Sequence, residues 1–158
     1  MSEIIQLVYA SRAAFATQGE DKGGIDPNVA RILTQSRNNN QRQALGGVLY
    51  YGDGCFFQCL EGERETLERV YGHIEADPRH HDIKILLRRN VPARRFADWS
   101  MKYVPAQEDI QRLLRDKGFS RFNPYRFDEE TIDQVLGILT QAGDPTHGAT
   151  KVRTNDPF

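Results

Sequence analysis

Two apolar runs joined by a three-residue turn constrain the fold of this chain more than any other feature. The runs are residues 45–51 and 55–60, and Gly52-Asp53-Gly54 separates them. Asp-Gly is a preferred dipeptide of tight hairpin turns, because both of its residues tolerate a positive φ. The sequence therefore predicts a β-hairpin in the middle of the chain, with the other strands and helices arranged around it.

Further strand and helix patterns surround the hairpin. Short β-branched or alternating apolar runs predict strands at residues 4–10, at 82–88 and within 96–104. Amphipathic spacing predicts one helix from Pro27, behind an Asp26 N-cap, to about Asn38. A second helix is centred on 67–74 and is closed by Asp77-Pro78, as its apolar positions indicate.

The order of these elements is β-α-β-β-α-β-β. Right-handed crossovers convert this order into an α+β ferredoxin-like sandwich with one extra strand. Two more helical stretches, at 106–117 and 128–142, follow it. We expect a main domain over 1–104, a helical cap over 105–142, and a disordered tail over 143–158, where no periodicity remains.

Composition excludes several classes of protein. The net charge is −1, from 21 basic and 22 acidic residues, so no overall field attracts nucleic acid. No apolar run is long enough to span a membrane. Cys55 and Cys59 lie about 13 Å apart on a strand, too far for a disulfide, and the adjacent His80 and His81 point apart, against a metal site. We expect a soluble, reduced, cytoplasmic protein.

Polar side chains gather on one face of the predicted sheet. Alternation along the strands puts Tyr9 and Ser11 on one face of the first strand and Gln58 on one face of the third. It puts Trp99 and Met101 together on one face of the fifth strand. The amides that follow Arg37 at the end of the first helix face the same region. Taken singly, these residues also have structural interpretations: the tyrosine as a core residue, the glutamine as a surface residue, and the asparagines as a helix C-cap. Together they indicate a slot for an aromatic cofactor, because unpaired buried polar groups are costly.

The motifs that carry these residues resemble the BLUF family of bacterial blue-light sensors, which use FAD. The resemblance covers roughly residues 4–104 in order and with matching spacing. Its motifs are Leu7-Val8-Tyr9-Ala10-Ser11, Ser36-Arg37 with Asn39-Asn40, Gly47-Val48-Leu49-Tyr50, Phe56-Phe57-Gln58-Cys59-Leu60-Glu61-Gly62, Asp77-Pro78-Arg79-His80-His81 and Arg95-Phe96-Ala97-Asp98-Trp99-Ser100-Met101.

The resemblance implies roles for the photoactive residues. Tyr9 would give an electron and a proton to the excited flavin, and Gln58 would bridge this tyrosine to the flavin and rearrange its hydrogen bonds. Trp99 and Met101 would change environment when the glutamine rearranges, and Ser11 would be hydrogen-bonded near Trp99.

The resemblance also implies a set of residues that bind the cofactor. Asn40, with Asn39 beside it, would hold the pyrimidine edge of the flavin. The other expected contacts are Gln58, Arg37, Ile32, His80 and Asp77.

The same resemblance implies how the protein works as a whole. The two final helices resemble the cap of short, single-domain members, so we expect a non-enzymatic photoreceptor that forms homo-oligomers and signals to a separate protein. Three departures bear on the cofactor: Ala44-Leu45-Gly46-Gly47 replaces Gly-Ile/Val-Thr-Gly, the 12–25 loop is longer, and His73 stands where many members have Arg. FMN or riboflavin could therefore compete with FAD.

Two enzyme classes remain as alternatives. An acylphosphatase-like hydrolase uses the same architecture, but it needs a Gly-rich phosphate loop next to the first strand, where this chain has none. A flavin-dependent redox enzyme needs an open site for a second substrate, which Gln58 and Trp99 would crowd.

Overall fold

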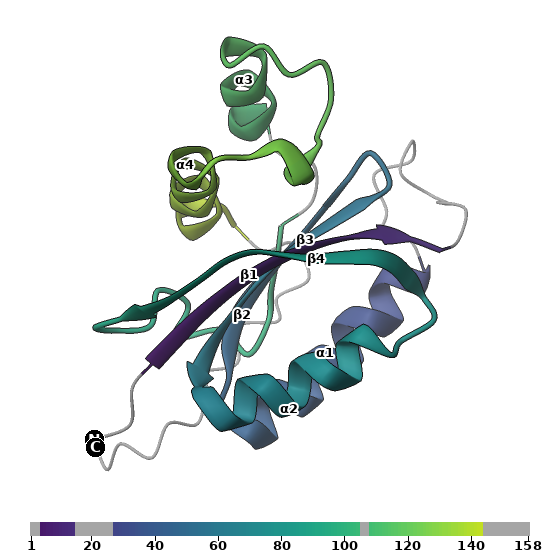
Figure 1. Cartoon of the computed structure of the whole chain (residues 1–158), viewed down its shortest axis with the longest axis vertical. Helices are drawn as coiled ribbons and strands as arrows, with labels where there is room; N and C mark the ends of the chain where they lie inside the picture. The colour runs from purple at the N-terminus through teal and green to yellow at the C-terminus, as the bar shows by residue number, and fades with distance from the viewer. Residues whose placement is uncertain (1–3, 15–26, 105–107, 144–158) are drawn as a thin grey trace.

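The computed structural model describes residues 4–14, 27–104 and 108–143 (Figure 1). Its strands are β1 Ile4–Ala13, β2 Gly46–Gly52, β3 Cys55–Glu63, β4 His80–Val91 and β5 Lys102–Val104. Its α-helices are α1 Pro27–Gln43, α2 Arg64–Glu75, α3 Glu108–Asp116 and α4 Glu129–Gln141, and a short 3-10 helix, η2, spans Pro124–Arg126.

The five strands form one sheet in the order β4-β1-β3-β2-β5. The first four strands pair antiparallel, and β5 adds to β2 in parallel. Because β3 is inserted between β1 and β2, the α1 crossover spans one strand, which is the ferredoxin-like arrangement. The predicted α+β ferredoxin-like fold with two additional helices is confirmed.

The two faces of the sheet carry separate hydrophobic clusters. Alternate residues of β1 illustrate the division, since Tyr9 lies in the cluster covered by α1 and α2, while Val8 lies in the cluster covered by α3 and α4. Figure 1 shows these two pairs of helices on opposite sides of the sheet. Each pair buries its apolar stripe against one face.

Two polar attachments tie α4 to the sheet besides its apolar face. Arg89 of β4 forms a two-pronged ion pair with Asp133, with 2.5 Å between Nη2 and Oδ1. Lys102 of β5 donates from Nζ to the carbonyl oxygen of Thr140 at 3.0 Å, in the last turn of the helix. The helix itself begins behind Asp128, whose carboxylate accepts from the Thr131 amide.

Several element boundaries differ from the sequence-based expectation. The first helix continues to Gln43 rather than ending near Asn38, because Arg37 and Asn40 are held by the carbonyl oxygens of Met101 and Ser100. Strand β4 is longer than expected at both ends, and β5 is limited to three residues. Asp26, most of the 12–25 loop and residues 144–158 of the expected tail lie outside the described residues.

Trp99 and Met101 do not share a face, contrary to the prediction. Both residues precede β5, in a segment without strand pairing, so the alternation of a strand does not apply to them. Met101 is buried in the cluster beneath α1 and α2. Trp99 packs against the opposite cluster, and its ring lies 5.1 Å from Nζ of Lys102.

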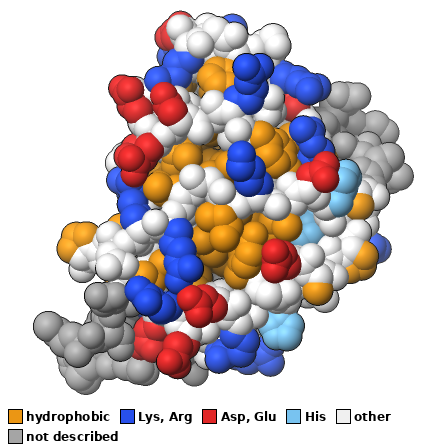
Figure 2. Space-filling view, in the orientation of Figure 1, with side chains coloured by type: hydrophobic (Ala, Val, Ile, Leu, Met, Phe, Trp, Pro, Cys, Tyr) orange, Lys and Arg blue, Asp and Glu red, His pale blue; other side chains and the backbone are white. Residues whose placement is uncertain are grey.

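The outer surface is mixed in character (Figure 2). Hydrophobic side chains cross the middle of the face shown, with charged side chains around them. Ile85 on the edge strand β4 is the large hydrophobic residue that is exposed, at 43 %, among the described residues. No helix in the described ranges has the length and apolar character needed to cross a lipid bilayer.

Candidate functional site

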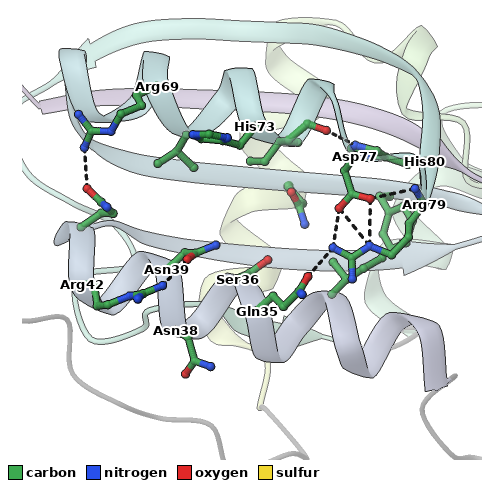
Figure 3. Close-up of a pocket in the computed structure, with 16 residues that line it drawn as sticks. Gln35, Ser36, Asn38, Asn39, Arg42, Arg69, His73, Asp77, Arg79 and His80 are labelled. Atoms are coloured by element: carbon green, nitrogen blue, oxygen red, sulfur yellow. Dashed lines mark hydrogen bonds and ion pairs between the residues drawn. The ribbon is translucent and has the colours of Figure 1, made fainter.

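A cavity of about 570 Å³ opens between α1 and α2, above strand β3 (Figure 3). Its size falls within the usual range for pockets that bind small molecules. Three groups of residues line it: from α1 Ile32, Gln35, Ser36, Asn38, Asn39, Arg42 and Gln43; from β3 Phe56 and Gln58; and from α2 and the turn after it Arg69, Val70, His73, Ile74, Asp77, Arg79 and His80.

An unpartnered phenol lies on this face of the sheet, although it is not among the residues that line the cavity. Tyr9 is fully buried on the face of the sheet that α1 and α2 cover, and its ring packs edge-on against Tyr71 with 5.6 Å between centroids. Its hydroxyl has no hydrogen-bond partner among the described residues. Burial, with smaller contributions from Tyr71, Cys59 and Asp77, holds the pKa of Tyr9 well above its usual value. The phenol is therefore protonated at neutral pH.

Gln58 lies directly opposite Tyr9 in the antiparallel pairing of β1 and β3. It shares a face of β3 with Phe56 and Leu60, as the alternation along a strand requires. Its side chain lines the cavity with 6 % of the residue exposed, and it makes no hydrogen bond within the described part of the chain. A carboxamide offers donors and an acceptor, so the cavity floor presents both hydrogen-bonding characters without a charge.

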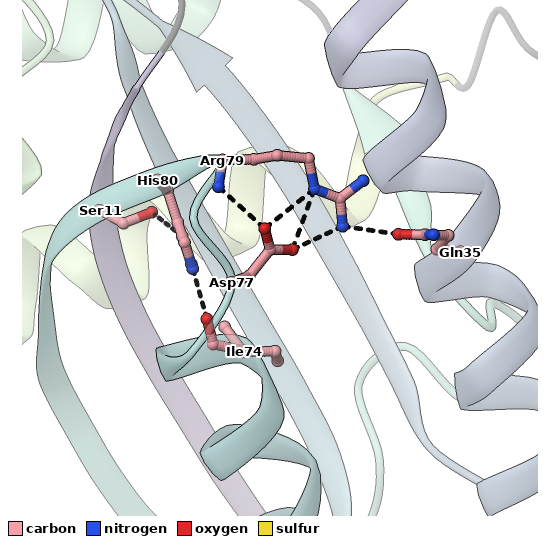
Figure 4. Close-up of polar contacts among 6 residues, drawn as sticks. All are labelled: Ser11, Gln35, Ile74, Asp77, Arg79 and His80. Atoms are coloured by element: carbon pink, nitrogen blue, oxygen red, sulfur yellow. Dashed lines mark hydrogen bonds and ion pairs between the residues drawn. The ribbon is translucent and has the colours of Figure 1, made fainter.

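One end of the cavity is closed by an ion pair. Asp77 accepts from Nε and Nη2 of Arg79 at 3.0 and 2.5 Å and also from the Arg79 amide (Figure 4). Arg79 reaches on to Gln35 of α1, with 2.6 Å between Nη2 and Oε1, so the pair joins both walls of the cavity. These hydrogen bonds, and then the charges of Arg79 and His80, lower the pKa of Asp77.

Ser11 contacts His80 and not Trp99, which corrects the expectation for this serine. Its hydroxyl oxygen lies 2.8 Å from Nδ1 of His80, and Nε2 of the same ring lies 2.5 Å from the carbonyl oxygen of Ile74 (Figure 4). A carbonyl only accepts, so Nε2 carries a proton. Ser11 donates to Nδ1 of a neutral ring and accepts from Nδ1 of a charged ring, and in both forms the two contacts fix His80 at the cavity wall.

The asparagines at the end of α1 have separate positions. Asn39 lines the cavity, as does the expected contact Ile32. Asn40 is buried beside it and donates from Nδ2 to the carbonyl oxygen of Ser100 at 2.6 Å. Arg37 donates from Nε to the carbonyl oxygen of Met101 at 3.0 Å. Asn40 and Arg37 thus hold the segment before β5, and neither is among the residues that line the cavity.

The unusual 44–47 motif lies at the edge of this arrangement. Ala44 has a φ of 57°, in the left-handed region where the family motif has glycine. Gly46 stands in the place of the motif's threonine, and a Cβ atom there would lie 2.5 Å from the carbonyl oxygen of Phe96. The backbone of the segment before β5 thus lies too close to β2 for a threonine. Gly46 does not line the cavity, so the absence of a threonine hydroxyl at this position does not change the cavity wall.

Sequence reasoning missed a buried carboxylate on the other face of β3. Glu61 is fully buried and accepts from Nε2 of Gln6 at 2.9 Å and from the amides of Arg95 and Phe96 at 3.0 and 2.8 Å. Gln6 in turn accepts from Arg89 at 2.9 Å. The predicted strand ends at Leu60, so Glu61 falls outside it. Its buried position follows from the extension of β3 beyond Leu60, which the sequence did not reveal.

Several cavity residues were also missed, although a signal was available. The missed residues Ser36 and Gln43 recur with the predicted contacts Ile32 and Asn39 at spacings of three and four residues, so all four share one face of α1. Arg69, His73 and Asp77 recur every four residues, although the last of them lies beyond the end of α2. Extending the expected first helix to Gln43 would have brought Arg42 and Gln43 into the site.

The residues present suit a flat aromatic heterocycle. Apolar walls come from Ile32, Phe56, Val70 and Ile74, and the Gln58 carboxamide lines the cavity between them. The buried Tyr9 hydroxyl, which has no partner among the described residues, lies on the same face of the sheet but does not line the cavity. A buried polar group without a partner costs about 1–3 kcal/mol, which a ligand with hydrogen-bonding atoms on its edge would offset. Groups of three or more His, Cys, Asp or Glu side chains that could hold a metal ion do not occur within the described ranges.

A ferredoxin-like sheet with this slot between two of its helices defines a candidate cofactor-binding domain. A family model described as "Sensors of blue-light using FAD" (BLUF) matches residues 4–102. The chain belongs to the BLUF family, as its motifs led us to expect. The family is one of sensors, in agreement with the expectation that this chain is not an enzyme.

Individual relatives show the same relationship. The blue light- and temperature-regulated antirepressor BluF of Escherichia coli K12 is 32 % identical over 98 residues, 60 % of this chain and 24 % of that protein. The chain thus matches about a quarter of the length of that curated relative. The ground-state structure of BlsA is 34 % identical with a TM-score of 0.81 and covers 94 % of this chain and 96 % of its own. The dark-state structure of the BLUF protein BlrB is 29 % identical with a TM-score of 0.70, and the match covers 89 % of this chain and 97 % of the BlrB chain.

Proposed function

We propose that this chain is a blue-light photoreceptor that binds FAD non-covalently in the cavity between α1 and α2. The single observation that carries the proposal is the pairing of Tyr9 with Gln58 across β1 and β3, where the Tyr9 hydroxyl has no partner among the described residues and Gln58 lines the cavity. An oxidisable phenol and a reversible hydrogen-bonding amide lie side by side on the sheet face that the cavity covers. FMN and riboflavin are the alternative cofactors.

In this proposal Tyr9 supplies an electron and a proton. The bound flavin supplies the absorption of blue light and an excited state that is a strong oxidant. Burial keeps the phenol protonated, so Tyr9 gives up its hydroxyl proton when it gives up the electron. Tyr71 contacts the Tyr9 ring but is less buried. We therefore assign the role of electron donor to Tyr9, the tyrosine that lies inside the protein.

Gln58 converts this transfer into a change of hydrogen bonding. Its carboxamide has an oxygen end that accepts and a nitrogen end that donates, so rotation or tautomerisation exchanges the two without moving a net charge. A carboxylate at this position could not make that exchange, because it only accepts when ionised. Its lack of a competing partner among the described residues supports this freedom.

The remaining residues bind and position the cofactor in our proposal. Ile32 and Asn39 provide contacts from α1, and Asp77 and His80 from the other end of the cavity. Asn40 and Arg37 act as positioning residues, because they hold the carbonyl oxygens of the segment that carries Met101. That segment has Met101 on the cofactor side of the sheet and Trp99 on the cap side, which suits a role in output.

The output itself is a change of contact with a separate protein. We propose residues 1–104 as the light-sensing domain and 105–142 as the cap through which the signal leaves. The described part of that cap shares one apolar cluster with the sheet, which supports coupling between them. We further propose a cytoplasmic homo-oligomer, as the resemblance to short family members implies. The near-neutral charge supports the proposal that it contacts no nucleic acid and no membrane.

An absorption spectrum tests the proposal directly. We expect purified protein to carry a flavin spectrum that shifts slightly to the red under blue light and recovers in the dark. Gln58→Leu should keep the flavin and lose the shift, whereas Gln111→Leu, at an exposed position of α3 outside the cavity, should keep both. Bleaching without a shift would favour the redox enzyme instead. Failure to bind added flavin would overturn the proposal and favour the hydrolase.

A further inference from the structure

The arginines that line the cavity fall into two groups according to their partners. Arg79 is neutralised by Asp77 through the contacts described above. Asp77 is the one acidic residue among those that line the cavity. The other two cavity arginines, Arg42 and Arg69, therefore add positive charge that the cavity lining itself does not balance.

Arg42 and Arg69, here called the arginine pair, contact neutral amides. Arg42 donates from Nη2 to Oδ1 of Asn39 at 2.7 Å, and Arg69 donates from Nη2 to Oε1 of Gln43 at 2.6 Å. Neither forms an ion pair with any residue in the described ranges. A guanidinium has five N–H donors in a planar fork, so these single contacts leave most of its donors available.

The arginine pair lies at one end of the cavity, on opposite walls. Arg42 is on α1 and Arg69 on α2, and their partners Asn39 and Gln43 are one helical turn apart. Figure 3 shows both side chains at the end away from the Asp77–Arg79 pair. Both are exposed, so this end is an open mouth where an anion can keep part of its hydration.

We propose that the arginine pair is an anion site that takes the phosphate ester of a flavin nucleotide. Two guanidiniums at the same end of the cavity suit a phosphate group, because each offers parallel donors to its oxygens and together they offset its negative charge. The inference rests on the proposed function and deepens it: the cavity selects phosphorylated flavins over riboflavin. The selection comes from residues at the mouth and not from those around the ring.

Flavin fluorescence quenching measures this selection without light activation. The flavin-free full chain is titrated with riboflavin, with FMN and with FAD, in low and in high salt. We expect FMN and FAD to bind about fivefold more tightly than riboflavin in low salt, as two exposed ion pairs would provide. High salt should reduce the difference, because the site is open to solvent.

A double variant assigns the difference to these residues. Arg42→Gln with Arg69→Gln should bind riboflavin as the wild type does and FMN no better than riboflavin. The matched control, Arg88→Gln with Arg112→Gln, removes the same charge from exposed arginines that pair with Glu68 and Glu108 outside the cavity. It should keep the preference for FMN.

The other outcomes separate this inference from the proposed function. Equal affinity of the wild type for FMN and riboflavin would overturn the anion site and leave flavin sensing intact. A preference for FMN that persists in the double variant would equally overturn the assignment to the arginine pair. If no flavin bound to the wild type, the proposed function and this inference would fall together.

Discussion

Tyr9 and Gln58 are direct neighbours across the antiparallel β1–β3 ladder, at the centre of the sheet. Directly opposed residues have Cβ atoms about 4.5–5.5 Å apart, so backbone hydrogen bonds fix their separation without any loop. A slip of one residue in this register would move Gln58 to the face covered by α3 and α4. The relation between electron donor and amide is therefore determined by the sheet itself.

Tyr9→Phe should keep the flavin and lose the red-shifted state. Phenylalanine preserves the buried ring but cannot release a hydroxyl proton. Tyr71→Phe is the matched control, because this tyrosine packs against Tyr9 with only 5.6 Å between ring centroids. Absorption difference spectra under blue light measure both variants. A normal red shift in Tyr9→Phe, or its loss only in Tyr71→Phe, would contradict the assignment of the donor.

The same variant has a consequence in the flavin-free protein that does not depend on light. The Tyr9 hydroxyl is buried without a partner among the described residues, so its removal should raise the free energy of unfolding by about 1 kcal/mol or more. Urea denaturation of flavin-free wild type and variant measures this change. A destabilised variant would mean that the hydroxyl has a partner in solution.

Local sequence patterns were sufficient for the sheet but not for the segment before β5. The alternation of β1 and β3 correctly placed Tyr9, Gln58 and Phe56 on one face, because that periodicity is imposed by the strand. The same reasoning failed for Trp99 and Met101, because strand pairing begins only at Lys102 and alternation does not apply before it.

The ends of elements were also beyond local reasoning. Helix α1 passes through a run of asparagines that have low helix propensity, and it is sustained there by contacts with carbonyl groups about 60 residues away. The buried position of Glu61 likewise depends on the amides of Arg95 and Phe96. Such tertiary contacts leave no local pattern in the sequence.

Ala44→Gly should stabilise the protein. Ala44 follows α1 with a φ of 57°, a conformation that costs an L-residue with a Cβ about 1 kcal/mol relative to glycine. We expect the free energy of unfolding to rise by up to about 1 kcal/mol in urea denaturation. Ala76→Gly at the C-cap of α2 is the control, because its φ of −84° needs no glycine. A gain from Ala76→Gly as large as that from Ala44→Gly would contradict the explanation.

Glu61→Gln should destabilise the protein, although it replaces a single oxygen atom and keeps the size and shape of the side chain. The Glu61 carboxylate accepts three hydrogen bonds, and the amide nitrogen of glutamine would meet one of those donors. The mismatch should cost about 1–3 kcal/mol of unfolding free energy. Glu63→Gln, at an exposed position of the same strand, should change stability by less than about 0.5 kcal/mol. Equal effects of the two variants would contradict a stabilising role of the three hydrogen bonds to the Glu61 carboxylate.

Asp77 should contribute to a loss of stability in acid. Its hydrogen bonds from Arg79 lower its pKa in the folded state below the unfolded value of about 3.9. The contribution is therefore complete above that unfolded pKa and is lost as the pH falls through the lower folded pKa. Urea midpoints measured from neutral pH to about pH 2 should fall less steeply for Asp77→Asn, and also for Arg79→Gln. An unchanged slope in both variants would contradict this role.

Lys102→Met should loosen the last turn of α4 while leaving the global stability within about 1 kcal/mol. The Lys102 amine is buried and donates to the carbonyl oxygen of Thr140, where a cation also favours the negative end of the helix dipole. Methionine keeps the apolar part of the side chain. Loss of the hydrogen bond lowers the free energy of unfolding, while removal of a buried charge raises it, so the two effects partly cancel. Hydrogen exchange of amides near Thr140 should accelerate, with little change in α3.

The same variant should alter Trp99, because the Lys102 amine lies 5.1 Å from its ring. The chain has one tryptophan, so its fluorescence reports this position alone. We expect a changed emission in Lys102→Met and none in Lys117→Met, which removes a charge from the exposed end of α3. If Trp99 emission and α4 exchange both stayed as in wild type, Lys102 would not link the segment before β5 to the cap.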